Sequence, residues 1–566
     1  MAAVRRIPVI LLIMLPVVLV GAAVVYYAVD IPYRADYSLQ NDLLQLRQQN
    51  SAVHTARQLF TSHEGQPIFW TRLVFLVCLA LNGTLSYYAL TLTGFAFLIV
   101  LLALLYAAFR RAGLALAYFI PVPFWLFSLQ SYETLLWSTA ALQAYSQMAF
   151  VLATFYLLAR NRHRERFIAL VPAVLALFSG NSGLPALIAG LLILFRQQHW
   201  RSIMIWSVVL IGCLSFYGYS DQPATPLSPV PLIPLPERIE SFFHSAGLFA
   251  DLTGAIPGRE TPSGLLVGLG IVLVLGTVYF LVRLAIKAFN RQTFPFWDDF
   301  FLASGLFLLM LFLSGIPAGT ELPGTGLPGA GLPDQSRLYS AVLVSILYLY
   351  SVFRWRFFSL RRWEAIVVTL STVVLSLLSS YWSMDGIVYQ HRQTIVAYLN
   401  WLQLTPAGHQ RAIRTVYVPT ATPFVKRIAR LTGPASLTID ASTQLDSLRE
   451  EPDQYVFVQE GHVNPTPANP DNGAYILLTS LEHRYLFAAW PAKPNRVAPT
   501  ASHPRYTPRQ FYAQIPKEDL RQGRYRIGIL TSEPDRASLA MTNQYLIFTP
   551  SDQQPEKDSA QPMAIK

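Results

Sequence analysis

Charged residues are scarce in this chain. Asp, Glu, Lys and Arg together make up 13% of the 566 residues, whereas 53% are hydrophobic, and the mean hydropathy is +0.37. Soluble domains carry charge on about a quarter of their residues. The composition therefore excludes an ordinary soluble domain and indicates a polytopic membrane protein.

Cysteines and the common catalytic motifs are also lacking. The two cysteines, Cys78 and Cys213, lie in or beside apolar segments and form no spaced pair, which excludes a disulfide framework and a cysteine metal site. No HExxH, nucleophile elbow or phosphate-binding loop occurs, so the sequence does not support the corresponding hydrolases or ATPases. No metal motif is present, and a divalent cation is left open as a cofactor.

The net charge of +11 is concentrated in short connections between apolar runs. Arginine and lysine in such connections set the orientation of membrane proteins. The excess therefore indicates membrane lipids as partners, and it gives no support to nucleic acid as a partner.

Apolar runs of the length that a membrane requires recur through the first 384 residues. Arg5 and Arg6 precede the first run, which is longer than a signal core and lacks a clear cleavage site, so we expect an uncleaved helix. The segment 67–80 is short and is predicted to be an interfacial helix. The eleven predicted spans are 7–29, 84–109, 112–129, 138–159, 167–181, 183–195, 202–219, 263–283, 299–316, 338–353 and 364–384.

The distribution of basic residues predicts the orientation of these spans. Clusters such as Arg110 with Arg111, or Arg361 with Arg362, fall in alternate connections. By the positive-inside rule the N-terminus is cytoplasmic, and an odd number of spans exports the C-terminus. We therefore expect a multi-pass protein of a bacterial inner membrane, with a periplasmic or extracellular C-terminal part.

The composition changes after residue 384. The amphipathic stretch 390–404 predicts a helix that leaves the membrane, and we place this connecting helix at 385–404. Short apolar runs separated by Pro, Asn, Asp and Gly then recur over 405–550, including 415–419, 436–440 and 454–459. This pattern predicts an exported β-sandwich-like domain, and the polar tail 551–566 is predicted to be disordered.

One long polar segment interrupts the apolar N-terminal half. Residues 30–72 contain the ionisable groups Asp30, Asp36, Asp42, His54, His63 and Glu64. Basic residues expected on the same outer side are Arg34, Arg72, Arg238, Arg259 and Arg337. A site is expected in this loop.

Several stretches resemble a known family. Residues 62–83, 128–138, 176–184 and 336–340 resemble, in this order, recurring stretches of bacterial GT-C-like membrane proteins of the O-antigen glucosyltransferase type. The resemblance covers roughly the first 385 residues. It implies a GT-C-like transmembrane domain over 1–384, and transfer of a sugar from a polyprenyl-phosphate donor to a glycan or lipid acceptor of the cell envelope.

The resemblance also implies roles for residues of the loop. Asp36 matches the general base that activates the acceptor hydroxyl, with Asp30 as the alternative, and Glu64 matches a second acid. His63 beside it is expected to bind substrate or to bond structurally. Arg337 and Arg259 are candidates for the donor phosphate, because arginine binds phosphate bidentately.

Glu133 lies in an otherwise apolar turn. Burial of its charge would be costly without a partner, so it either binds substrate or pairs within the protein.

Two other functions fit the same composition. A transporter or flippase of envelope lipids or polysaccharides would carry charges within its spans and internal repeats, and little of either is seen. A non-catalytic envelope assembly protein with an exported binding domain also accounts for the sequence.

Overall fold

The structure is a computed structural model. It describes residues 7–48, 58–63, 66–180, 183–220, 234–252, 263–314, 335–354, 362–404, 410, 413–417, 446–451, 453–460, 470–492, 510–532 and 537–549. The chain forms two compact units. The helical unit consists mainly of Met1–Gly324, Pro328–Gln390 and Arg411–Pro419, and the sheet unit of His391–Gln410 and Thr420–Lys566.

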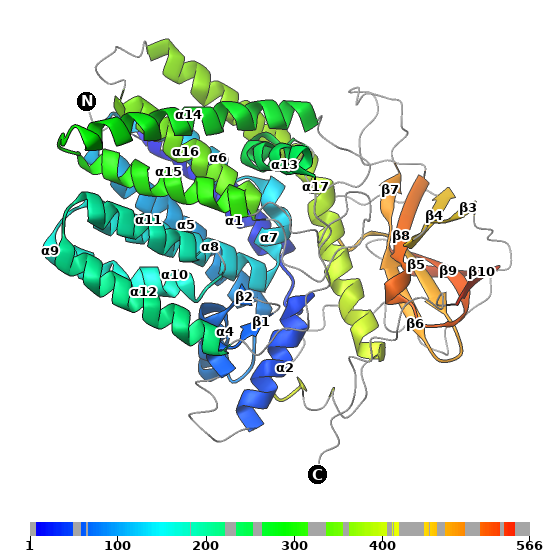
Figure 1. The fold of residues 1–566 in the computed structure, drawn as a ribbon. Coiled ribbons are helices and arrows are strands. Elements are labelled where there is room, and N and C mark those ends of the chain that lie inside the picture. Colours follow the sequence, from blue (N-terminus) through cyan, green and yellow to red (C-terminus); the bar gives the residue numbers. More distant parts are fainter. Residues whose placement is uncertain are drawn as a thin grey trace. The chain divides into compact units, whose positions relative to one another are not determined.

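Seven helices in the described part of the chain are long and apolar enough to cross a membrane. The chain is thus a multi-pass membrane protein, in which each span satisfies its backbone hydrogen bonds internally. These helices, labelled in Figure 1, are α1 (Ile7–Tyr27), α5 (Tyr87–Arg111), α8 (Ser138–Ala159), α14 (Ser263–Phe289), α15 (Phe296–Ser314), α16 (Ser336–Arg354) and α17 (Arg362–Leu404).

The structure does not confirm the predicted count of eleven spans. No continuous helix covers 112–129, where the chain forms η2 (Leu116–Phe119), α6 (Pro121–Leu126) and η3 (Leu129–Ser131). Pro121 and Pro123 explain the break, because proline lacks the N–H and clashes with the preceding turn.

The predicted span 167–181 is also interrupted. It is covered by the end of α9 (His163–Ile168) and by α10 (Leu170–Leu177), which has only 8 residues. The apolar helices α4 (Phe69–Asn82) and α11 (Gly183–Arg196) have 14 residues each. They are shorter than a typical span, as was predicted for the segment 67–80.

Helix α8 lies at the centre of the helical unit. It packs against α5, α10, α11 and α15, and its residues are buried along most of its length. By contrast, only 22% of the apolar part of α1 is buried. The lipid-facing helix α1 and the central helix α8 therefore differ in their surroundings, although both are apolar.

Short elements connect the spans on the side of the polar loop. The described parts of the loop 30–72 form α2 (Ala35–Gln48), β1 (Ser62–His63) and β2 (Gln66–Pro67), and the turn before α8 forms α7 (Tyr132–Leu136). The connection between α12 (Trp200–Ser220) and α14 contains α13 (Leu235–Gly247) and η4 (Leu248–Ala250). Sequence analysis did not predict this helix, and the rest of the Pro-rich stretch lies outside the described residues.

Helix α17 is continuous over 43 residues. The predicted last span, 364–384, and the predicted connecting helix, 385–404, are therefore one helix. Its first part is apolar and exposed at positions such as Leu370 and Leu377, as a lipid-facing span requires. Its later part carries more polar residues, which explains why composition alone placed a boundary at 385.

The described residues of the sheet unit form two four-stranded antiparallel sheets. The strand orders are β10-β9-β5-β6 and β3-β4-β8-β7. Alternate residues of β9, Tyr525, Ile527 and Ile529, join one apolar core with Phe457 of β4 and Ile515 of β8, as two-residue periodicity dictates. The strands are β3 (Ser447–Glu450), β4 (Gln454–Glu460), β5 (Gly473–Thr479), β6 (Arg484–Ala488), β7 (Trp490–Ala492), β8 (Gln510–Pro516), β9 (Gly523–Ser532) and β10 (Ala537–Phe548).

The predicted C-terminal sheet region is thus present, with differences in detail. Residues 415–417 form a turn instead of the predicted strand. The Leu85 N–H donates to the carbonyl of Val416 at 2.7 Å, so this segment belongs to the helical unit. Strand β8 was not predicted, and the predicted strand 436–440 and tail 551–566 lie outside the described residues.

Candidate functional site

Asp36 is a buried carboxylate in the first turn of α2, with 1% of its surface exposed. Its Oδ2 accepts the Tyr33 N–H at 3.0 Å and the Ser138 hydroxyl at 2.8 Å. Its Oδ1 accepts the indole N–H of Trp137 and the N–H of Thr139, both at 3.3 Å, and also the Thr139 hydroxyl. Five donors thus face a carboxylate that offers about four lone pairs.

These bonds make Asp36 a cap for helix α8. The N-cap residue itself is Trp137, which has no side-chain acceptor, so the free N–H groups of the first turn need an acceptor from elsewhere. Asp36 supplies it, and its negative charge is favoured at the positive end of the helix dipole. Burial nevertheless raises the pKa of Asp36 from 3.8 to about 6, against the lowering effect of these hydrogen bonds.

Asp30 has a similar position at helix α5. Its Oδ1 accepts the Ser86 hydroxyl at 3.2 Å and the Tyr88 N–H at 3.1 Å, while its backbone carbonyl accepts the Tyr417 hydroxyl at 2.6 Å. Ser86 is the N-cap residue of α5. Asp30 and Asp36 therefore hold the loop at the N-termini of two spans. Both residues have a structural role.

Tyr33 lies within electrostatic reach of a cation and of a second carboxylate. Burial raises the pKa of the Tyr33 phenol, the charge of Arg34 lowers it, and the charge of Glu133 raises it, so both ions lie within electrostatic reach of the ring. The Arg34 guanidinium lies 5.0 Å from the Tyr33 ring centre and 5.7 Å from that of Trp137. Tyr33, Arg34, Asp36, Glu133 and Trp137 are called the first-loop cluster below.

Glu133 belongs to α7 and is half-buried. Within the part of the chain that the structure describes, no hydrogen bond or ion pair engages its carboxylate. Glu133 differs in this respect from Asp36, whose oxygen atoms are fully engaged. It is the more accessible carboxylate for a substrate hydroxyl.

Arg337 is neutralised within the protein. Its guanidinium bonds the Asp251 carboxylate at 3.0 Å and the Gln130 carbonyl at 3.1 Å. Asp251 is itself buried, and a buried charge is stable only when it is paired. The ion pair thus holds the start of α16 against the residues that follow η4 and against η3.

Other polar groups of the loop are also engaged or buried. Asp42, expected to be a solvated acid, pairs with the buried Arg72 at 2.7 Å. Gln40 lies one turn after Asp36 on α2, fully buried, and neither amide atom has a hydrogen-bond partner in the described residues. The same holds for the buried Thr71 hydroxyl. Such orphaned groups are costly, and a bound polar molecule would satisfy them.

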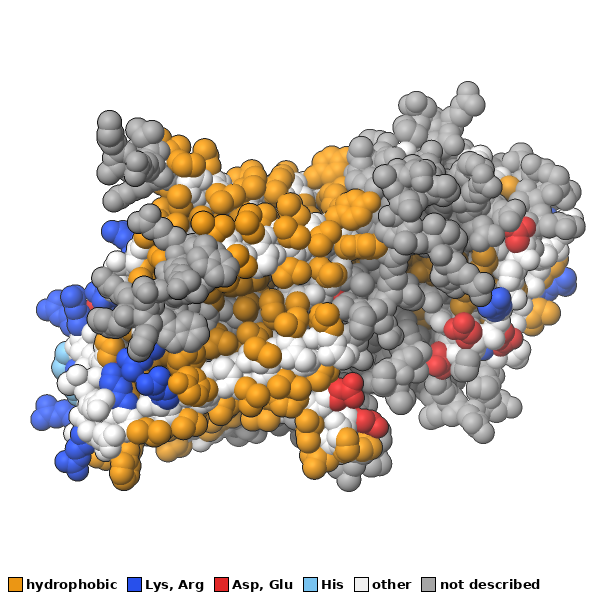
Figure 2. All heavy atoms as spheres, turned by 90° about the horizontal axis from the view of Figure 1, so that it is seen from above, with side chains coloured by type: hydrophobic (Ala, Val, Ile, Leu, Met, Phe, Trp, Pro, Cys, Tyr) orange, Lys and Arg blue, Asp and Glu red, His pale blue; other side chains and the backbone are white. Residues whose placement is uncertain are grey.

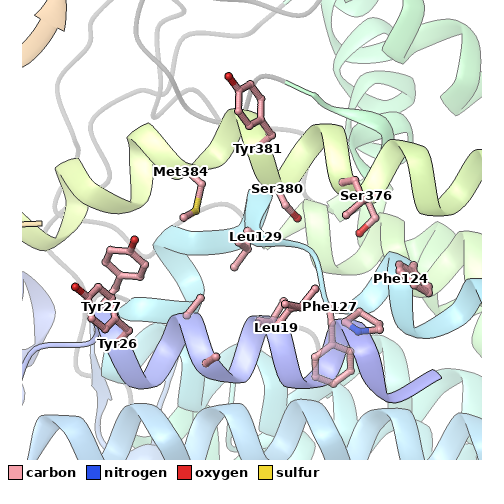
Figure 3. Close-up of a pocket in the computed structure, with 15 residues that line it drawn as sticks. Leu19, Tyr26, Tyr27, Phe124, Phe127, Leu129, Ser376, Ser380, Tyr381 and Met384 are labelled. Atoms are coloured by element: carbon pink, nitrogen blue, oxygen red, sulfur yellow. The ribbon is translucent and has the colours of Figure 1, made fainter. Parts of the chain in front are cut away.

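An apolar groove of about 390 Å³ lies between α1 and α17. Figure 3 shows Tyr26 and Tyr27 at one end and Phe124 and Phe127 towards the other. Its full lining is Pro16, Leu19, Val20, Ala22, Ala23, Tyr26, Tyr27, Phe124, Phe127, Leu129, Ser376, Leu377, Ser380, Tyr381 and Met384. The shape and lining suit a hydrocarbon chain.

Tyr132 joins the groove to the first-loop cluster. It packs with Tyr27 and Val388, next to Met384 of the groove. Its phenol also lies in the fields of Glu133 and Arg337, while burial raises its pKa well above the usual value. A molecule whose apolar part lies in the groove would therefore have its polar end near these charges.

The remaining predicted residues are less informative. His63 ends β1, whose side chains are not described, and Glu64 and Arg259 lie outside the described residues. No group of His, Cys, Asp and Glu side chains suited to a metal is found among the described residues. The structure thus brings Asp36 and Glu133 into one cluster, with Asp30 and Arg337 at neighbouring helix ends.

Sequence analysis missed several residues of this region. Ser138, Thr139 and Trp137 lie in or next to an apolar span, and Asp251 lies in a loop with no motif. A polar Ser-Thr pair at the start of an apolar helix is a signal for helix capping, and it could have indicated that an acid docks there.

Comparison with known proteins finds no matching family model, curated protein or solved structure. The resemblance to GT-C-like membrane proteins therefore stays a prediction. The assignments of Asp36, Glu64 and Asp30 as catalytic acids stay predictions as well.

Proposed function

We propose that this protein is a membrane glycosyltransferase that transfers a sugar from a polyprenyl-phosphate donor to a glycan or lipid acceptor of the cell envelope. One observation carries the proposal: a cation and a carboxylate, Arg34 and Glu133, both lie within electrostatic reach of the buried Tyr33, and Tyr132, which Glu133 also influences, packs beside an apolar groove. A lipid phosphate needs a hydrocarbon site and a cation next to each other.

The donor lipid would lie in the groove between α1 and α17. Within the bilayer an isoprenoid chain would replace acyl chains on the apolar lining, and van der Waals packing would hold it there. The groove faces Tyr26 and Tyr27 at the end of α1, only a few residues before Arg34. The phosphate of a lipid seated there would be close to the first-loop cluster.

Arg34 would stabilise the leaving phosphate. It is half-buried, and in the described residues no carboxylate pairs with it, whereas Arg337 is already neutralised by Asp251. Its backbone has a positive φ of 47°, a conformation that non-glycine residues adopt rarely. Cations placed where charge develops lower the barrier of such a reaction.

Glu133 would accept the proton of the acceptor hydroxyl. A general base must be within reach of the hydroxyl, and the Glu133 carboxylate is accessible, whereas five donors occupy that of Asp36. Asp36 would then hold the loop and Arg34 in place. The buried amide of Gln40 and hydroxyl of Thr71 offer unused hydrogen bonds for sugar hydroxyls.

The test is transfer of labelled sugar from polyprenyl phosphate to envelope acceptors in membranes that contain each variant. Glu133→Gln is expected to lower the turnover by about 10²–10⁴-fold, the usual contribution of a general base. Arg34→Gln is expected to raise the KM for the donor as well as to lower the turnover. Glu240→Gln, a change at an exposed acid of α13, is the matched control and should leave transfer intact.

The groove is tested separately. Ala23→Phe fills part of the groove and is expected to weaken donor use, whereas Val25→Phe at a position exposed outside the lining should not. Equal transfer by all of these variants would refute the assignment of the site. Absence of transfer by the folded natural chain with every donor tried would refute the function and favour an assembly protein.

A further inference from the structure

A cluster of cations lies at the other ends of the spans, around the short helix α9 and the turn between α11 and α12. We name it the α9 arginine cluster, and its members are Arg164, Arg166, Arg201, His163 and His199. Figure 2 shows basic side chains and histidine gathered at one end of the helices, beside hydrophobic side chains.

The α9 segment and the α11–α12 turn are held together by side-chain contacts. The His199 Nε2 lies 2.9 Å from Asn161 Oδ1, and the indole N–H of Trp206 donates to the Arg166 carbonyl at 3.4 Å. Burial lowers the pKa of His199, and so do the charges of Arg166, His163 and Arg196. His199 therefore lies within electrostatic reach of Arg166, His163 and Arg196.

Acidic residues compensate only part of this charge. Glu165 binds Arg160 at 2.8 Å and approaches Arg162 at 3.9 Å, and Asp299 binds Arg196 at 2.5 Å. No carboxylate of the described residues pairs with Arg164, Arg166 or Arg201.

Among these arginines, Arg166 shows most clearly that a partner for the positive charge is missing. Its surface is only 9% exposed, and its Nε is buried without an acceptor in the described part of the chain. A buried N–H donor of a charged group is unfavourable when it lacks an acceptor. An anion from outside the chain would offset this cost.

The surroundings of the cluster indicate which anion fits. Trp200, directly before Arg201, is 61% exposed, and Phe167, Ile168 and Met204 are exposed as well. Exposed apolar and aromatic side chains next to arginines are typical of the boundary between membrane and water. A soluble anion would match the charges but would leave these side chains in water.

We propose that the α9 arginine cluster binds the phosphate headgroup of an anionic phospholipid. Arg164, Arg166 and Arg201 contact the phosphate, while Trp200, Met204 and Ile168 contact the acyl chains. The site orders the connection between α8 and α10, and it is separate from the first-loop cluster.

The test measures retention of dioleoylphosphatidylglycerol by the purified full chain in detergent, by native mass spectrometry. The variant Arg164→Gln/Arg201→Gln changes two exposed positions, and it is expected to lower retention by about tenfold or more, because each arginine near an anionic surface contributes several-fold. Arg166→Gln is expected to act in the same direction. The control Arg291→Gln/Arg354→Gln removes two other exposed arginines that precede or follow spans, and it should retain the lipid.

Three results would overturn the proposal. Equal loss in the control variant would mean general attraction by positive charge. Equal retention of dioleoylphosphatidylcholine by the natural chain would mean that the headgroup charge is not recognised. Complete displacement of the lipid by millimolar inorganic phosphate would identify a site for a soluble anion.

Discussion

Asp36 caps helix α8 by accepting the N–H of Thr139 at 3.3 Å, although the two residues are separated by 103 positions in sequence. The bond joins the first polar loop to the most buried span of the helical unit. Folding of the loop and correct packing of α8 are therefore coupled.

Asp36→Ala is expected to destabilise the helical unit by about 1–2 kcal/mol or more, because the Thr139 N–H and Ser138 hydroxyl in the first turn of α8 lose their acceptor. Thermal unfolding in detergent, followed by circular dichroism, measures the change. Gln45→Ala, at an exposed position of the same helix α2, is the control and should alter stability by less than about 0.5 kcal/mol. Equal effects of the two changes would contradict the capping role.

The stability of the helical unit is expected to fall as the pH rises from about 4 to about 6. Burial raises the pKa of Asp36 in the folded chain to about 6 from 3.8, so in this window the folded state binds the proton that the unfolded state has released. Stability then decreases with pH. Unfolding of the natural chain and of Asp36→Asn over pH 4–7 tests this, and the variant should lose this part of the dependence.

The Arg337–Asp251 ion pair is expected to show a coupling free energy of about 1–3 kcal/mol in a double-mutant cycle. Both side chains are largely buried, at 17% and 7% exposure, so removal of one takes an oppositely charged neighbour away from a largely buried charge. The variants are Arg337→Gln, Asp251→Asn and their combination. The exposed pair Lys517–Glu450 of the sheet unit, at 2.7 Å, is the control and should couple by less than about 1 kcal/mol.

Gly386→Ala is expected to destabilise the packing of α17 against α7 by about 1–3 kcal/mol. A Cβ at this position would lie 2.4 Å from the Tyr132 ring, whereas a Cβ at Gly268 of α14 would meet nothing within 4 Å. Gly268→Ala should therefore be neutral or slightly stabilising. Partial rescue of Gly386→Ala by Tyr132→Ala would confirm the steric cause, and its absence would contradict it.

Ile476→Ala is expected to cost the sheet unit about 2–4 kcal/mol, because its side chain is fully buried in the core between the two sheets. Ile547→Ala removes the same atoms from a position that is 68% exposed, and it should cost far less. Limited proteolysis of the full chain against denaturant measures both. A similar loss in the two variants would contradict the two-sheet core.

Sequence analysis predicted the parts of the fold that depend on local composition. Long apolar runs predicted the spans around α1, α5, α8 and α14. The insertion of a segment into the bilayer depends on its hydrophobicity and length, which are local properties of the sequence. Short β-like runs between turn residues predicted β4, β5, β9 and much of β10. The count of spans was less predictable, because Pro121 and Pro123 interrupt a run whose overall hydropathy is high enough for a membrane.

The candidate site was predictable only in its location. Acids after the first span marked the loop, but the sequence does not identify Asp36 as the acid that meets Thr139 or Asp251 as the acid that meets Arg337. Such contacts depend on residues that are distant in sequence and come together when helices pack.

Composition by itself thus determined that this chain enters a membrane and carries a C-terminal sheet region, because hydrophobicity and its period act locally along the chain. The tertiary structure decided what the charged residues do. In the folded chain Asp36 and Asp30 accept hydrogen bonds at helix ends, and Arg337 is paired with Asp251. Glu133 and Arg34 lie within electrostatic reach of Tyr33. The physical reason is that the energy of a charge depends on its burial and its partners, and both are set by long-range packing.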